Sequence, residues 1–139
     1  MLRYIDFRAI VLATLAVFGI DSVSEIVLFS SFSNLPAGAS DEQVKAVAAA
    51  LAVDPGFLRA ALFLGTASTV AGGFLVARLA RQIPYFNALA YAVLGMALSI
   101  AFSAMPGADF PLWFRVVGIG LTVPASLVGA YFGRRPLSK

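Results

Sequence analysis

Two carboxylates interrupt an apolar stretch near the start of the chain, and they are the residues best suited to chemistry. The segment FGIDSVSEIVLF, residues 18–29, carries Asp21 and Glu25 four positions apart. In a helix, residues at that spacing lie on one face, one turn apart. Acidic side chains inside a membrane are rare, and they mark proton relays, cation sites or ion pairs within a bundle. We therefore take this pair as the candidate ion or proton site.

The composition of the chain indicates that this stretch lies in a membrane. Of the 139 residues, 60% are hydrophobic and 12% are charged, and the mean hydropathy is +0.91. A soluble domain of this length would need a larger charged surface, so we predict an integral membrane protein. The pI near 9.7 does not indicate nucleic acid as a partner, because the basic residues form no run with interleaved aromatic side chains.

The residue types missing from the chain narrow its chemistry. It contains no Cys and no His, which argues against disulfides, thiolate or imidazole metal sites, His-ligated haem and His-based triads. No G-x-x-x-x-G-K-[ST] run is present, so the chain has no P-loop. A serine hydrolase would need a Lys or carboxylate base, and neither Lys lies within a predicted span. We therefore expect no enzymatic activity, no cofactor and no metal.

Four apolar segments are long enough to cross a bilayer, which takes about 20 residues of helix. They cover residues 9–32, 55–80, 84–104 and 110–132. Turn-forming residues separate them, and Asp54-Pro55 suits the N-cap and first turn of the second span. The sequence therefore predicts an all-α fold, a four-helix bundle in which residues 1–139 form a single transmembrane domain.

The loop after the first span is the longest and carries a helix signal of its own. Ser40 and Gln43 have the spacing of a capping box, and apolar residues then recur at helical intervals from Val44 to Leu51. This pattern predicts a short amphipathic helix over about residues 41–53, lying on the outer membrane surface. We interpret it as a connector in preference to a lid or a partner surface.

The distribution of basic residues predicts how the bundle is oriented. Lys and Arg gather on the cytoplasmic side of membrane proteins. With the N-terminus inside, that side receives most of the basic residues, namely Arg3, Arg8, Arg78, Arg81, Arg134, Arg135 and Lys139, and the outside receives Lys45, Arg59 and Arg115. We therefore predict a multi-pass protein of the bacterial inner membrane with both termini in the cytoplasm.

Two arginines are candidate ion-pair partners for the acidic residues. In this orientation Arg115 and Arg59 both enter the outer third of the bilayer, at the level of Glu25. Arg115 is the preferred partner because it lies on the small-residue face of its helix, and Arg59 is the alternative. Asp21 lies deeper, has no obvious basic partner and is expected to be uncharged. Asp21 and Glu25 can therefore belong to an ion-pair network that stabilises the bundle, to a site that handles protons or cations, or to a surface that faces a partner.

Small residues predict which faces of the second and fourth spans pack closely. Gly65, Thr69 and Gly72 share one face of the second span, with Gly118 and Ala125 on one face of the fourth. The bulky side chains of the second span, Phe63, Val70 and Phe74, lie on its other face. Because little hydrophobic force acts between helices in lipid, close backbone approach holds them together. We expect these five small residues to contact neighbouring helices.

Two resemblances bear on this pattern. The acidic first span, together with GGFLVAR at residues 72–78, resembles uncharacterised four-helix bacterial membrane proteins, which brings no activity with it. The chain is also similar to the small multidrug resistance transporters in size, helix number and a carboxylate on the first helix. By that analogy Asp21 or Glu25 would be the proton and cation site. The long first loop, the second acid and the biased basic residues depart from that family.

These observations lead to two functional hypotheses. The first is a small transporter or ion- or proton-handling subunit, which works in a homo-oligomer or larger complex around Asp21 and Glu25. The second is a non-catalytic membrane scaffold or accessory subunit, whose polar interior only fixes helix packing. In both cases the expected partners are membrane lipids and other protein subunits.

Overall fold

The computed structural model describes residues 4–80, 82–103 and 110–134. Its helices are α1 (Phe7–Phe32), α2 (Asp41–Leu51), α3 (Pro55–Leu79), α4 (Pro84–Ser103) and α5 (Leu112–Gly133), and the described residues contain no strand. All except α2 are long and apolar enough to cross a membrane. The predicted all-α membrane bundle is confirmed, with helix bounds close to the predicted spans; Ala104, the predicted end of the third span, lies outside the described residues.

Polar caps fix where the first three helices begin. The Asp6 carboxylate accepts a hydrogen bond from the backbone N–H of Ala9 at 3.1 Å and starts α1. Ser40 forms the predicted capping box with Gln43 at the start of α2. Asp54 caps α3 in the same way, and Pro55 occupies the first helical position, where no backbone N–H is needed.

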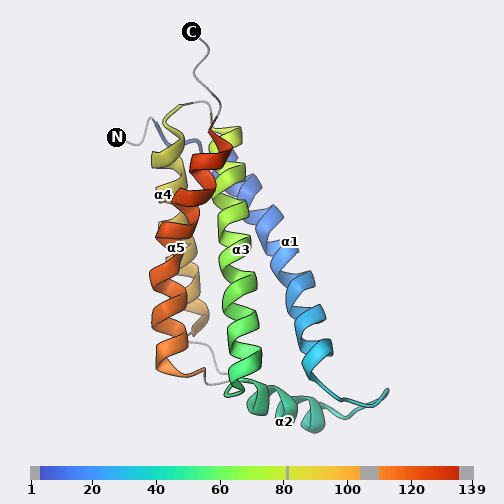
Figure 1. The fold of residues 1–139 in the computed structure, drawn as a ribbon. Helices are drawn as coiled ribbons and strands as arrows, with labels where there is room; N and C mark the ends of the chain where they lie inside the picture. The colour runs from blue at the N-terminus through green and yellow to red at the C-terminus, as the bar shows by residue number, and fades with distance from the viewer. Residues whose placement is uncertain (1–3, 81, 104–109, 135–139) are drawn as a thin grey trace.

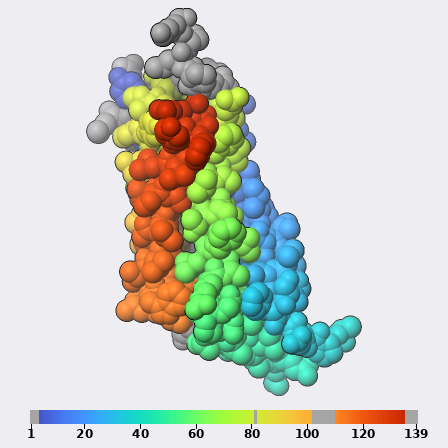
Figure 2. All heavy atoms as spheres, viewed as in Figure 1, coloured from blue at the N-terminus to red at the C-terminus, as the bar shows by residue number. Residues whose placement is uncertain are grey.

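The arrangement of the helices is seen in Figure 1. α3 lies between α1 on one side and α5 on the other, with α4 packed against α3 and α5. α1 leans away from α3 toward the end of the bundle that carries α2. The beginning of α1 and the end of α5 lie together at the opposite end, which we call the terminal end. α1 forms one edge of the molecule in Figure 2, with α2 projecting at its base.

The described basic residues divide between the two ends of the bundle. Arg8, Arg78 and Arg134 belong to the first turn of α1, the last turn of α3 and the C-cap of α5, so all three lie at the terminal end. Lys45 lies on α2, and Arg59 and Arg115 lie near the starts of α3 and α5, at the α2 end. The other basic residues used to predict the orientation lie outside the described residues; they are Arg3, Arg81, Arg135 and Lys139.

The closest packing in the bundle joins α3 to α5. A Cβ atom at Gly129 or Gly133 would overlap the backbone of α3 at Val70 or Phe74, and one at Gly73 would overlap the backbone of Ser126 in α5. Small residues therefore let the two backbones touch, as membrane helices require for strong packing. The Ser126 hydroxyl also donates a hydrogen bond to the carbonyl of Ala88 at 2.9 Å and ties α5 to α4.

α1 is packed unevenly along its length. Its buried residues, Ala9, Ile10, Ala13 and Val17, all lie in the half near the terminal end. Beyond Val17 no residue of α1 is buried. The rings of Phe32 and Phe57 meet edge to face, with 5.7 Å between their centroids, and this contact holds the far end of α1 to α3. The acidic residues lie between these two attachments.

Candidate functional site

The two acidic residues lie on the loosely packed half of α1. Asp21 is partly buried, whereas Glu25, one turn closer to the α2 end, is exposed. The two carboxylates are close enough to interact electrostatically. Within one chain, therefore, Asp21 faces the bundle and Glu25 lies at its margin.

The expected ion pair between Glu25 and an arginine is not found. No ion pair joins Glu25 to Arg115 or Arg59 in the part of the chain that the structure describes. The order of the helices explains this result, because Arg115 belongs to α5, which lies across α3 from α1. Arg59 shares the sector of α3 that contains Val70, whose backbone touches α5. Both arginines are thus on the side of α3 that faces away from α1.

Asp21 lies level with a buried hydroxyl on α3. The contact between Phe32 and Phe57 sets the register of these antiparallel helices. Asp21 is as many residues from Phe32 as Ser68 is from Phe57, so the two residues lie at the same level of the antiparallel helices. Ser68 is only 5% exposed.

α4 contributes a second hydroxyl to this region. Tyr91 is 7% exposed and packs in a core cluster with Ile10 and Ala13 of α1 and Val76 of α3. Its hydroxyl lies against Gly72, at a place where any larger residue would collide with the ring. Asp21 is near enough to Tyr91 to interact with it electrostatically. Gly72 therefore makes room for a tyrosine that reaches toward α1.

Thr14 adds a third hydroxyl on the same sector of α1 as Asp21. Its Oγ1 atom is buried and has no hydrogen-bond partner among the described residues. Other hydroxyls of these helices bond to a carbonyl one turn back, as Thr69 does to Gly65 at 2.8 Å and Thr122 to Gly118 at 3.0 Å. A buried hydroxyl without a partner is costly, so each such group in a native structure calls for an explanation.

We use the name polar cluster for Thr14, Asp21, Ser68 and Tyr91, the polar side chains along the region where α1 faces α3 and α4. It draws on α1, α3 and α4 and offers one carboxylate and three hydroxyls. The described residues contain no group of three His, Cys, Asp or Glu side chains that could hold a metal ion. An intramembrane carboxylate of this kind is typical of proton relays and ion pathways.

The residues predicted to pack helices together occupy different environments. Gly72 lies against Tyr91, and Ala125 is buried. Gly118 packs against Leu62 in ordinary van der Waals contact: a Cβ atom added at the glycine would lie 3.8 Å from the Leu62 side chain. Thr69 is partly buried. Gly65 faces open space, so the expectation that it contacts another helix is wrong. The small-residue face of α3 is thus closed near Gly72 and open near Gly65.

Sequence reasoning missed the main contact of α3. The sector with Val70 and Phe74 was assigned to bulky side chains that point away from the packing face. In the structure their backbone atoms, not their side chains, meet Gly129 and Gly133 of α5. On α5 these two glycines do belong to the small-residue face that the sequence predicts to pack closely, so the error concerned only the face of α3 that they meet.

Comparison of the chain with protein-family models, with curated proteins and with solved structures gives no match.

Proposed function

We propose that this small multi-pass membrane protein is a transporter or ion-handling subunit, which binds a proton or a monovalent cation at Asp21. The observation that supports this most strongly is the polar cluster. Asp21 has no basic partner among the described residues and interacts electrostatically with Tyr91, and the buried hydroxyl of Thr14, two turns away on the same face of α1, has no partner among them. The proposed role needs neither a catalytic residue nor a cofactor.

A carboxylate without an ion pair can exchange its proton. A neighbouring arginine would hold Asp21 permanently in its charged form, since opposite charges favour ionisation. The other members of the polar cluster are uncharged, so a proton or cation bound at Asp21 would neutralise the charge of the cluster within the membrane. The hydroxyls supply oxygen atoms for the bound ion or water in place of bulk solvent.

Glu25 supports an assembly of several subunits. It is exposed on α1 next to Ile26 and Val23, which are 69% and 63% exposed. A carboxylate facing lipid costs about 2.5–3.5 kcal/mol at the centre of a bilayer. A second copy or another membrane subunit covering this half of α1 would remove that exposure. We therefore propose that the protein works as a homo-oligomer or as part of a complex in the bacterial inner membrane, with both termini cytoplasmic.

Flux measurements in reconstituted vesicles test the proposal. The wild-type protein should carry protons or monovalent cations down an imposed gradient, and Asp21→Asn should abolish that flux while the protein still folds. Ser68→Ala and Thr14→Val should weaken apparent ion affinity severalfold. Asp54→Asn is the matched control, because asparagine preserves the helix cap of α3 outside the cluster. Flux that survives Asp21→Asn would refute the role given to this residue.

The alternative is a non-catalytic scaffold or accessory subunit, which the tight backbone contact between α3 and α5 favours. In that case neither the wild type nor any variant would show flux, and Asp21→Asn would leave assembly unchanged.

A further inference from the structure

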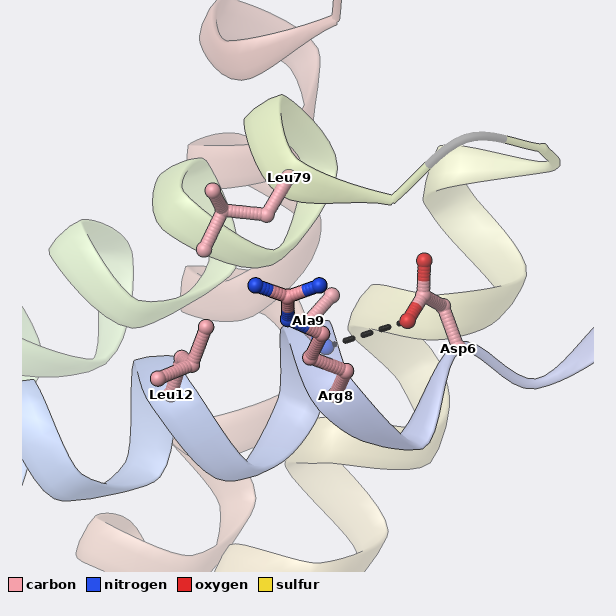
Figure 3. Close-up of a pocket in the computed structure, with 5 residues that line it drawn as sticks. All are labelled: Asp6, Arg8, Ala9, Leu12 and Leu79. Atoms are coloured by element: carbon pink, nitrogen blue, oxygen red, sulfur yellow. Dashed lines mark hydrogen bonds between the residues drawn. The ribbon is translucent and has the colours of Figure 1, made fainter.

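A cavity opens at the terminal end of the bundle, between the start of α1 and the end of α3. Its volume is about 430 Å³, and it is lined by Asp6, Arg8, Ala9, Leu12 and Leu79. Figure 3 shows the Arg8 guanidinium pointing from α1 toward the turn of α3 that carries Leu79, with the Asp6 carboxylate to one side. The cavity thus combines an anion, a cation and two leucine side chains.

The position of Asp6 is fixed by its surroundings. Its Oδ1 atom accepts the hydrogen bond from Ala9, and its backbone N–H donates to Oδ1 of Asn87 at 2.6 Å. Asn87 is fully buried, and its amide group donates to the carbonyl oxygens of Tyr4, Gln82 and Ile83. The carboxylate is therefore held rigidly at the mouth of the cavity, and one of its oxygens is not used by the cap.

The two charges at the cavity are not paired with each other. Arg8 is exposed, and no ion pair joins it to Asp6 within the described chain. The negative and the positive group are thus presented side by side, each able to bind a group of opposite charge. A ligand that matches both must itself carry a cation and an anion a short distance apart.

The cavity lies at the depth of lipid headgroups. α1 has 26 residues and is about 39 Å long at 1.5 Å per residue. The hydrocarbon core of a bilayer is about 30 Å thick, so the ends of α1 extend into the headgroup region. Asp6 and Arg8 belong to the cap and first turn, whereas Leu12 lies one turn deeper. Polar groups at the mouth and leucines below match the order of a phospholipid from headgroup to acyl chain.

We propose that this cavity binds a phospholipid whose headgroup carries a primary amine, as in phosphatidylethanolamine. The phosphate binds the Arg8 guanidinium, the ammonium donates hydrogen bonds to the Asp6 carboxylate, and an acyl chain lies along Leu12 and Leu79. An anionic phospholipid without an amine leaves Asp6 next to its phosphate with no cation between them. A choline headgroup has no N–H to donate. The site lies several turns of α1 away from Asp21 and does not depend on the proposed ion-handling function.

Native mass spectrometry of the purified protein tests this site. Delipidated protein in detergent is mixed in turn with phosphatidylethanolamine, phosphatidylglycerol and phosphatidylcholine that have the same acyl chains. The wild type should retain the ethanolamine lipid best. Arg8→Gln should weaken that binding about tenfold, through loss of a charge-assisted hydrogen bond, whereas Arg8→Lys should keep most of it. Arg78→Gln is the control, because Arg78 is an exposed arginine at the same end that does not line the cavity.

The substitution Asp6→Asn distinguishes recognition of the ethanolamine headgroup from a general attraction between charged residues and lipid. Asparagine preserves the helix cap but removes the negative charge, so the fold is retained. The variant should lose the preference for ethanolamine and bind phosphatidylglycerol at least as well. Equal retention of all three lipids by the wild type would overturn the proposal. So would equal losses in Arg8→Gln and Arg78→Gln, which would indicate only a general attraction between basic residues and lipid.

Discussion

Gly129 of α5 lies directly against the backbone carbonyl of Val70 in α3, with no side chain between the two helices. The same relationship recurs one turn further on, where Gly133 meets Phe74, and from the opposite helix, where Gly73 meets Ser126. Contacts of this kind supply the packing and weak Cα–H···O interactions that hold helices together in lipid. They make α3 and α5 the rigid part of the bundle, onto which α4 and α1 pack.

We predict that Gly129→Ala lowers the free energy of unfolding by about 1–3 kcal/mol, because the new methyl group meets backbone atoms that cannot move aside. Gly65→Ala is the matched control. It lies in the middle of α3 with open space around it, so it should be neutral or slightly stabilising. Unfolding in mixed detergent micelles measures both variants. Equal effects would mean that the contact between α3 and α5 is not close in the membrane.

Asn87 should be the most sensitive polar residue of the described bundle. Asn87→Ala removes the acceptor for the Asp6 N–H and the donor to three carbonyl oxygens, so we expect a loss of about 2–4 kcal/mol. Asn87→Asp should be at least as harmful, because a carboxylate would face the same carbonyl oxygens. The exposed Asn34, outside the bundle core, provides the control substitution Asn34→Ala. A stable Asn87→Ala protein would show that water replaces these bonds.

The hydrogen bond from Ser126 to Ala88 should contribute modestly. Interhelical hydrogen bonds in membranes are worth about 0.6 kcal/mol on average and up to about 1.7 kcal/mol. We expect Ser126→Ala to cost an amount within that range, since the hydroxyl is buried and its bond links two helices. Ser30→Ala removes an exposed hydroxyl that bonds only within α1, and it should cost less. The difference between their thermal unfolding midpoints in detergent measures the interhelical bond.

Reporter fusions test the proposed orientation. A fusion at Gly38, before α2, should be active as a periplasmic reporter, and one at Gln82, between α3 and α4, as a cytoplasmic reporter. The expectation follows from the gathering of Arg8, Arg78 and Arg134 at the terminal end. The reversed pattern of activities would place the termini outside.

The elements of the fold were predictable because their signals are local. Ser40 with Gln43, and Asp54 with Pro55, fix helix starts through bonds within a few residues, and apolar length defines the spans. The site was only partly predictable, because its contacts depend on which helices are neighbours. Glu25 and Arg115 match in depth and charge, but nothing local in the sequence places α3 between them. Likewise, Gly65 and Gly72 share a helical face, and only the position of Tyr91 distinguishes them.

The hydrogen bond between Asp6 and Asn87 has a consequence for how the chain is made. The two residues are 81 positions apart, so the bond cannot form until the chain has been synthesised as far as α4. α1 is synthesised before α3 and α4, yet its buried half needs Val76 of α3 and Tyr91 of α4 as neighbours. The helix that carries Asp21 and Glu25 therefore gains its final contacts only after α3 and α4 have been made.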